Sequence, residues 1–265
     1  MFVSIFLLIC VATHASELEL FTENFPPYNF IGHNEIIGIN ADILSRACLI
    51  ADIDCTVSLL PWSRAYKAAS VMQNSGVFST SRNEQRENEF IWVGPLVSSN
   101  TCFYRLKTRS DIVVTNSDSL KNYTVGISRN DIYEKVLQNK GFQKGINYLT
   151  YSKKHEDTKV FKNGKLDLII GSSVTLASQL GSAGIKLEDV VPVFELKDDS
   201  LVGNFLALNK TTDPIIAAKL QDAIDQLKAT GEFESIISSY IGTTTFSDNP
   251  LPSNLEPCVD GKANY

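Results

Sequence analysis

The chain has 265 residues, 43% hydrophobic and 20% charged, which is enough for one large domain or two packed lobes of ordinary globular composition. Its formal net charge of -6 and isoelectric point near 5.2 leave no basic surplus to neutralise phosphates or anionic lipids. Nucleic acid is therefore not an expected partner, and a protein that handles a small molecule fits better.

The first fifteen residues contain no Lys, Arg, Asp or Glu, and the apolar run from Phe2 to Val11 is shorter than the ~20 residues of a membrane-spanning helix. This composition predicts a secretory signal peptide over residues 1–15, with Thr13 and Ala15 as the small residues before the cleavage site. The run lacks the usual positive charge before it, which leaves a mis-set start codon open. Lipidation at Cys10 is a weaker alternative, because a bulky residue precedes it. We expect a periplasmic protein that is soluble once cleaved.

Four cysteines follow the predicted cleavage site, and an even number in an exported chain predicts disulfides. Cys48 and Cys55 lie between a helical pattern and a strand pattern, so a local bridge is easy; two free buried thiols are the alternative. Cys102 and Cys258 pair only by elimination. The absence of a Cys-x-x-Cys motif or a His-bearing cluster in the sequence gives a zinc site little support.

The first elements of the chain alternate between strand and helix. Residues Glu17 to Phe21 predict a strand, followed by a loop with a Pro-Pro pair. Apolar residues at helical spacing predict a helix over Asn40 to Ile50, with Asn40 or Asp42 as its cap. The pattern continues with a strand at Thr56 to Leu60, a helix at Ser63 to Gln73 and a strand at Gly76 to Thr80. This βαβαβ order predicts a parallel sheet covered by helices.

A second, smaller α/β unit is predicted in the middle of the chain. It consists of strands at Thr101 to Leu106, Tyr123 to Ile127 and Leu166 to Ile170, with helices at Asp131 to Asn139 and Val174 to Leu180. A strand at Gly203 to Asn209 and two amphipathic helices follow, at Asp213 to Thr230 and Glu232 to Tyr240, the first started by an Asp-Pro pair. From Pro250 onward there is no periodicity, which predicts a loose tail.

Several short motifs stand in a characteristic order along the chain. They are Phe25-Pro-Pro-Tyr-Asn-Phe30, Gly38-Ile-Asn-Ala-Asp42, Pro61-Trp-Ser-Arg64, Arg86-Glu-Asn-Glu-Phe-Ile-Trp-Val-Gly-Pro95, Val125-Gly-Ile127, Gly164-Lys-Leu-Asp167, Gly231-Glu-Phe233 and Tyr240-Ile-Gly242. Each motif alone is weakly specific. In this order and spacing they resemble the family 3 extracellular solute-binding proteins, the periplasmic amino-acid-binding components of ABC importers. The interval from Cys48 to Cys55 also matches a disulfide of basic-amino-acid-binding members.

The resemblance implies an α/β, two-lobed periplasmic binding protein type 2 fold, with mixed sheets flanked by helices and two crossing hinge strands. Residues 16–106 and 203–242 would form lobe one, residues 107–202 lobe two, and residues 243–265 a tail. A ligand would lie between the lobes and close them on binding. We therefore expect a monomeric protein that captures a small polar, carboxylate-bearing solute for an ABC permease, uses no cofactor or metal, and is not an enzyme.

The resemblance makes Arg86 the leading candidate to hold a ligand carboxylate, since a guanidinium fork can donate two parallel bonds. The alternative is a surface arginine paired with Glu84, Glu87 or Glu89. Arg82 is the runner-up for the carboxylate.

Other lobe-one positions match ligand contacts of the family. Ser79 and Ser81 would offer backbone and hydroxyl groups to the same carboxylate, and Asn83 replaces the usual threonine. Phe25 and Trp62 match the two positions that sandwich the ligand side chain, where rings suit an apolar, aromatic or cationic group. For Trp62 a plain core position is an equal alternative.

Further candidates lie in both lobes. Tyr28 is a candidate to line the cleft. Asn130 and Asp131 start the helix that follows Gly126-Ile127, where free backbone NH groups can meet an anion; we expect Asp131 to cap the helix and Asn130 to contact the ligand. Ser172 stands where amino-acid-binding members carry an aspartate that pairs with the α-ammonium. Either another acid such as Asp131 takes over, or the ligand is not an ordinary α-amino acid.

Two other classes of function stay open. A dehydratase or lytic enzyme on the same scaffold would need a carboxylate in the cleft as acid or base, and only Asp131 qualifies among the positions placed there. His33 and His155 lie in polar loops without a nucleophile motif beside them. A soluble sensor component is the third possibility.

Overall fold

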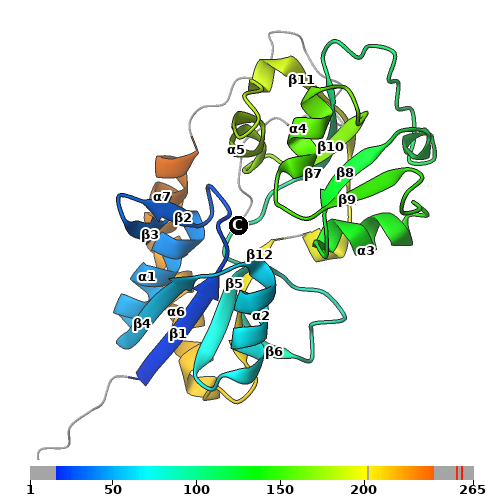
Figure 1. The fold of residues 1–265 in the computed structure, drawn as a ribbon. Helices are drawn as coiled ribbons and strands as arrows, with labels where there is room; N and C mark the ends of the chain where they lie inside the picture. The colour runs from blue at the N-terminus through cyan, green and yellow to red at the C-terminus, as the bar shows by residue number, and fades with distance from the viewer. Residues whose placement is uncertain (1–15, 202, 242–254, 256–257, 259–265) are drawn as a thin grey trace, which may run out of the picture.

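The computed structural model describes residues 16–201, 203–241, 255 and 258, which form two lobes, each built on a five-stranded sheet (Figure 1). The predicted signal peptide, residues 1–15, and most of the predicted tail lie outside the described residues. The strand orders are β4-β1-β5-β12-β6 in the first lobe and β11-β7-β10-β8-β9 in the second. The α/β fold with mixed sheets is therefore confirmed.

The first sheet begins as a parallel βαβαβ unit and ends with antiparallel strands. Its strands are β1 (Ser16–Thr22), β4 (Ile53–Leu59), β5 (Ser75–Ser81), β6 (Phe90–Val93) and β12 (Asn204–Asn209). Strands β4 and β5 run parallel to β1, whereas β12 runs antiparallel to β5 and β6. A hairpin, β2 (Phe30–Gly32) and β3 (Glu35–Ile37), precedes the first helix. Period-two alternation sends successive side chains to opposite faces, so helices can cover both faces.

Four helices complete the first lobe: α1 (Ile39–Ala51), α2 (Trp62–Val71), α6 (Pro214–Thr230) and α7 (Glu232–Tyr240). Helices α1, α6 and α7 share one apolar core with the sheet, and α2 packs against the other face. The Asp-Pro start signal of α6 is confirmed: Pro214 is the first helical residue, and Asp213 caps the helix by accepting from the Ile215 NH. The expected cap of α1 is wrong: Gly38 holds that position, and the Asp42 carboxylate instead accepts from the Tyr240 hydroxyl.

The second sheet contains β7 (Thr101–Leu106), β8 (Val125–Ser128), β9 (Tyr148–Tyr151), β10 (Leu168–Ser172) and β11 (Val190–Glu195). Helices α3 (Ile132–Asn139), α4 (Glu156–Lys162) and α5 (Leu176–Gly181) flank it, with 3-10 turns at Ser119–Asn122, Leu187–Asp189 and Asp199–Leu201. Phe103 faces the core under α3, while its neighbours Cys102 and Tyr104 face the core under α4 and α5.

Strand β7 corrects the expected lobe boundary at residue 106. It pairs antiparallel with β10 and β11 and therefore belongs to the second lobe. The chain crosses between lobes at residues 94–100 and returns at residues 196–201 and 203. These crossings lie side by side, because the Leu96 NH donates to the Asn204 carbonyl and the Asn204 NH donates to the Val97 carbonyl. Paired crossing segments of this kind allow hinge motion between lobes.

Both expected disulfides are present. Cys48 in α1 bonds to Cys55 in β4, and Cys102 in β7 bonds to Cys258. The Tyr104 hydroxyl donates to the Cys258 carbonyl at 2.8 Å, and Leu255 packs in the same core. At these described positions the segment after the first lobe is therefore attached to the second lobe, which differs from the expected loose tail.

Candidate functional site

A cavity of about 480 Å³ lies between the two lobes, a volume typical of small-molecule sites. The parallel strands explain its position. Strands β1, β4 and β5 of the first lobe and β8, β9 and β10 of the second all end at residues that line the cavity or lead directly into loops that do. The carboxyl ends of parallel strands are the usual place for ligand sites in open α/β sheets.

Most of the side chains expected at the site line this cavity, although they come from distant parts of the chain. They are Phe25, Tyr28, Trp62, Ser79, Ser81, Arg86, Asn130, Asp131 and Ser172. Asn83 is the exception, because its side-chain oxygen accepts from the Arg86 backbone NH at 3.0 Å and so stabilises the turn before Arg86. It faces a second hollow, together with Arg82, and the expectation that Asn83 lines the ligand cavity is wrong.

Arg86 extends its guanidinium along the cavity wall. Its Nη1 donates to the Ser81 carbonyl at 3.2 Å, and its Cζ lies 5.5 Å from the Trp62 ring centroid and 5.2 Å from that of Tyr66. Among the described residues no carboxylate forms a salt bridge with Arg86. The neighbouring acids are engaged elsewhere, since Glu87 pairs with Arg82 at 2.5 Å and Glu89 accepts from Tyr66. The guanidinium is thus available to an anion from the cavity.

Ser79 reaches the cavity through an irregularity in β5. Its φ is 59°, a left-handed value, and the pairing of β5 with β12 shifts register beside it. Bulges of this kind turn a side chain out of the regular pattern of a strand. The Ser79 hydroxyl donates to the Asn29 side-chain oxygen and accepts from the Asn40 amide at 2.9 Å. Both of its hydrogen-bonding roles are therefore filled by the first lobe.

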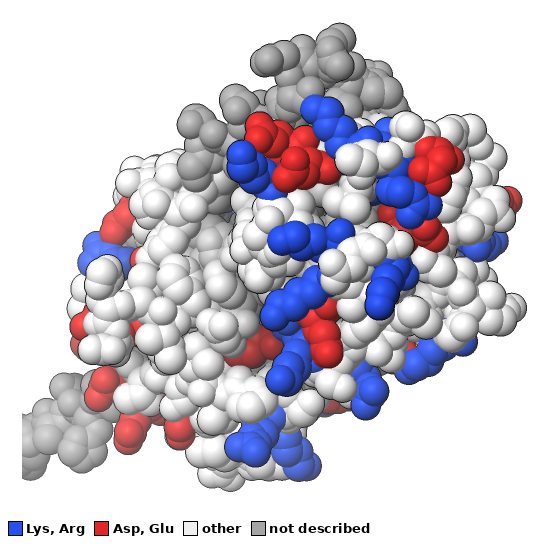
Figure 2. Space-filling model, turned by 45° about the horizontal axis from the view of Figure 1, so that its top comes forward, with Lys and Arg blue, Asp and Glu red and all other residues white. Residues whose placement is uncertain are grey.

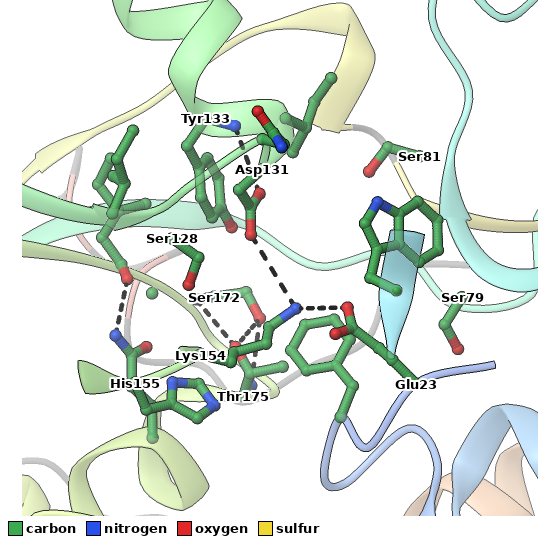
Figure 3. Close-up of a pocket in the computed structure, with 18 of the residues that line it drawn as sticks. Glu23, Ser79, Ser81, Ser128, Asp131, Tyr133, Lys154, His155, Ser172 and Thr175 are labelled. Carbon is green, nitrogen blue, oxygen red and sulfur yellow. Dashed lines mark hydrogen bonds and ion pairs between the residues drawn. The ribbon is translucent and has the colours of Figure 1, made fainter. Parts of the chain in front are cut away.

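The loop between β9 and α4 places a lysine across the cleft. The Lys154 ammonium lies 2.9 Å from Glu23 Oε1 of the first lobe and 4.0 Å from Asp131 Oδ2 of the second (Figure 3). The same nitrogen stands 3.6 Å from the Phe25 ring centroid. Burial acts to lower the pKa of Lys154, but the carboxylates of Glu23 and Asp131 outweigh it and raise that pKa above its ordinary value. Lys154 is therefore charged.

The start of α3 faces Lys154 with a carboxylate. Asp131 caps the helix as expected, with Oδ1 accepting from the Tyr133 NH at 3.4 Å. Asn130 precedes it with a φ of 60°, and its backbone NH is bonded to Glu134. The side chain of Asn130 lines the cavity, as expected of a ligand contact.

Ser172 is buried and held by its own chain. Its hydroxyl lies 2.8 Å from the Thr175 hydroxyl and accepts from the Thr175 NH, which fixes the turn into α5. Tyr28 also lines the cavity, with its hydroxyl 3.3 Å from the Ser99 hydroxyl. Burial raises the pKa of Tyr28. Ser172 therefore brings a polar but uncharged group to the cavity wall.

Two ionisable groups at the start of α4 have strongly shifted pKa values. Burial raises the pKa of the Asp157 carboxyl to about 6, helped by nearby Asp131 and opposed by hydrogen bonds from backbone NH groups. Burial together with the charge of Lys154 lowers the pKa of His155 to about 4. At neutral pH the cavity therefore contains a neutral imidazole and a carboxylate that is close to its titration range.

Sequence reasoning missed Glu23, Lys154 and Asp157. Glu23 directly follows the predicted first strand, so its place at the carboxyl end of that strand was a usable signal. Lys154 and Asp157 follow β9, a short strand that the sequence analysis did not predict. The alternative enzyme hypothesis counted Asp131 as the only acid in the cleft, and the structure corrects this to three.

The rest of the described structure adds two findings. Within residues 16–241 apart from residue 202, no three His, Cys, Asp or Glu side chains lie close enough to hold a metal ion, and no helix is long and apolar enough to cross a membrane. Figure 2 shows Lys and Arg side chains along a central band of one face, with acidic side chains among them.

The two lobes, the paired crossings and the cavity between them define the two-lobed fold of the periplasmic binding proteins. The sequence profile of the bacterial extracellular solute-binding proteins, family 3, matches residues 20–243, and the chain belongs to this family. It is similar to the Bacillus subtilis (strain 168) protein named Probable amino-acid-binding protein YxeM, with 21% identity over 81% of this chain and 79% of that protein.

Solved structures share the fold at low sequence identity. A histidine kinase sensor domain with similarity to periplasmic binding proteins has a TM-score of 0.74 at 17% identity, covering 86% of this chain and 97% of the other. A Salmonella typhimurium periplasmic binding protein of high arginine specificity has a TM-score of 0.69 at 18% identity, covering 86% and 100%. The arginine-, lysine-, histidine-binding protein ArtJ from Geobacillus stearothermophilus has a TM-score of 0.68 at 14% identity, covering 87% and 97%.

Proposed function

We propose that this chain is an exported solute-binding protein that holds a small carboxylate-bearing solute between its lobes and delivers it to an ABC permease. The observation that carries the proposal is Arg86, whose guanidinium faces a cavity of ligand size without a carboxylate partner among the described residues. The half-buried guanidinium donates from Nη1 to the Ser81 carbonyl and has further N–H donors left for an anion. Family membership supports the solute-binding role, and the predicted signal peptide supports export.

Binding measurements on the purified chain test the proposal. A thermal-shift screen against amino acids, organic acids and polyamines, followed by calorimetry on the hits, should yield a carboxylate-bearing ligand. Arg86→Ala should weaken its binding by roughly 30-fold or more, because a charged hydrogen-bonded partner of the carboxylate is lost. The matched control is Arg82→Ala, which removes an arginine outside the cavity and should leave the affinity unchanged. Equal affinity of Arg86→Ala and wild type would refute the carboxylate assignment.

An enzyme on the same scaffold is the second candidate, and Asp157 is the observation in its favour. A buried carboxyl with a pKa of about 6 in a cavity has the protonation behaviour of a general acid or base. Family membership favours binding without chemistry. We therefore expect no turnover of arogenate, prephenate or peptidoglycan fragments by the wild-type chain. Turnover that Asp157→Asn abolishes would establish the enzyme instead.

A further inference from the structure

Lys154 belongs to the second lobe, but its ammonium makes its shortest contacts with the first. It lies 2.9 Å from a Glu23 carboxylate oxygen and 3.6 Å from the centre of the Phe25 ring. The lysine and glutamate side chains are 23% and 21% exposed, so the pair is largely withdrawn from water. A second carboxylate, Asp131, stands 4.0 Å away on the opposite side and is 18% exposed.

These partners have the chemistry that attracts an ammonium group. Two carboxylates supply the opposite charge, and an aromatic face attracts a cation that stands over it. Figure 3 shows the Lys154 nitrogen between the carboxylates of Glu23 and Asp131. The chain therefore fills its own cation subsite with a side chain, and the Phe25 ring, expected to stack on a ligand, already carries a protein cation.

Among the described residues that line the cavity, few other acidic groups could bind the ammonium of a ligand. Apart from Glu23 and Asp131, its only acid is Asp157, which is 4% exposed. Ser172 contributes a hydroxyl that is already bonded to Thr175. In contrast, Arg86 faces the cavity without a carboxylate partner among the described residues, and Arg129 and Lys153 also line it. The cavity therefore still contains positive charge that a ligand would have to neutralise.

We propose that Lys154 is a built-in occupant of the ammonium subsite formed by Glu23, Asp131 and Phe25, and that it makes the chain select small carboxylates lacking an ammonium group over the corresponding amino acids. This inference rests on the proposed solute-capture function and assigns its ligand class. A ligand ammonium would have to displace Lys154 and break its pair with Glu23. A carboxylate without an ammonium meets Arg86 and leaves that pair intact.

The experiment removes the Lys154 ammonium by substitution and adds a free ammonium compound in its place. Lys154→Ala removes three carbons and the ammonium beyond Cβ, and n-butylamine, as its ammonium ion, supplies an ammonium on a chain one carbon longer than the part removed. Millimolar n-butylamine should raise the melting temperature of Lys154→Ala but not that of wild type, and n-butanol should do neither. Lys159→Ala, an exposed lysine of α4, is the matched control and should not respond. Lys154→Ser, a second variant that lacks the ammonium, repeats the measurement in case Lys154→Ala does not fold.

Solute pairs that differ only in the ammonium group test the selectivity. Wild type should bind glutarate more tightly than L-glutamate, or 4-methylpentanoate more tightly than L-leucine. In Lys154→Ala the ratio of the two affinities should shift towards the amino acid by about tenfold or more, so that the order reverses. The reason is that the ligand ammonium now meets two unpaired carboxylates. Lys159→Ala should keep the wild-type order.

The outcomes separate this inference from the proposed function. Wild type that prefers the amino acid of a pair overturns the inference, while solute capture stands. The same preference in Lys154→Ala and wild type also overturns it. If wild type binds no solute at all, the capture function fails, and the n-butylamine measurement alone then decides whether the ammonium subsite exists.

Discussion

The two shifted groups at the start of α4 predict opposite pH dependences that a pair of single variants can separate. Asp157 has a folded pKa of about 6 against 3.8 for an unperturbed aspartate. Its neutral form stabilises the fold, so this contribution is fully present below pH 3.8 and is lost as the pH rises through about 6. The shift of about two units corresponds to roughly 3 kcal/mol in the free energy of unfolding.

His155 acts in the opposite sense over nearly the same range. Its folded pKa of about 4 lies below the ordinary 6.5, so its contribution is present above pH 6.5 and is lost as the pH falls through 4. The size is again roughly 3 kcal/mol, as an upper value because the ring is partly exposed. In the wild-type chain the two contributions largely cancel, and these two groups together give only a small slope between pH 4 and 6.

Each variant should reveal the slope of the remaining partner. Relative to the wild-type profile, Asp157→Asn should lose roughly 3 kcal/mol more as the pH falls from about 6.5 to 4, because of these two groups only the histidine still titrates. His155→Asn should instead lose a similar amount as the pH rises from about 4 to 6. Asparagine is chosen because His155 has a φ of 62°, which asparagine tolerates well.

Urea unfolding at pH steps between about 4 and 7 measures these slopes. The matched control is His33→Asn, an exposed loop histidine outside the cavity with a φ of 53°, which should keep the wild-type profile. If the Asp157→Asn and His155→Asn profiles run parallel to each other and to wild type, the burial and charge argument for these two groups is wrong.

Two further predictions concern stability. Replacing both cysteines of the Cys102–Cys258 bridge by serine should lower the free energy of unfolding by up to about 5 kcal/mol, against about 2 kcal/mol for Cys48–Cys55. The difference arises because the bridges join residues 156 and 7 apart in sequence. Urea unfolding of the two double variants measures both losses, and equal or reversed losses would contradict this. Gly126→Ala should lower stability by about 1–3 kcal/mol, because a Cβ would lie 2.4 Å from the nearest side-chain carbon. Gly181→Ala, with open space around it, is the control in the same thermal melts, and a similar effect of both substitutions would refute the packing explanation.

The local pattern of the sequence was sufficient for most elements and for the Cys48–Cys55 disulfide, whereas Cys102 and Cys258 were paired only by elimination. The helix α1 differs from its predicted range by one residue at each end, and α6 begins at Pro214, within the predicted Asp-Pro start signal. These features depend on contacts within one or two turns, or on the even number of cysteines. The motifs from Phe25 to Gly242 were specific enough to indicate the family, which the profile match confirms.

Contacts between distant segments decided the rest. Strand β7 has the composition of any buried strand, so only its pairing with β10 and β11 assigns it to the second lobe. Asn83 is a local exception: it matched a ligand position by sequence, yet its side-chain oxygen accepts from the Arg86 backbone NH three residues later, which holds it in the turn. The pair of Glu23 and Lys154 joins residues 131 positions apart, and no local periodicity encodes such a contact. The charge of the cavity, and hence its preferred ligand, is a property of the folded chain because folding brings these groups within a few ångströms of one another.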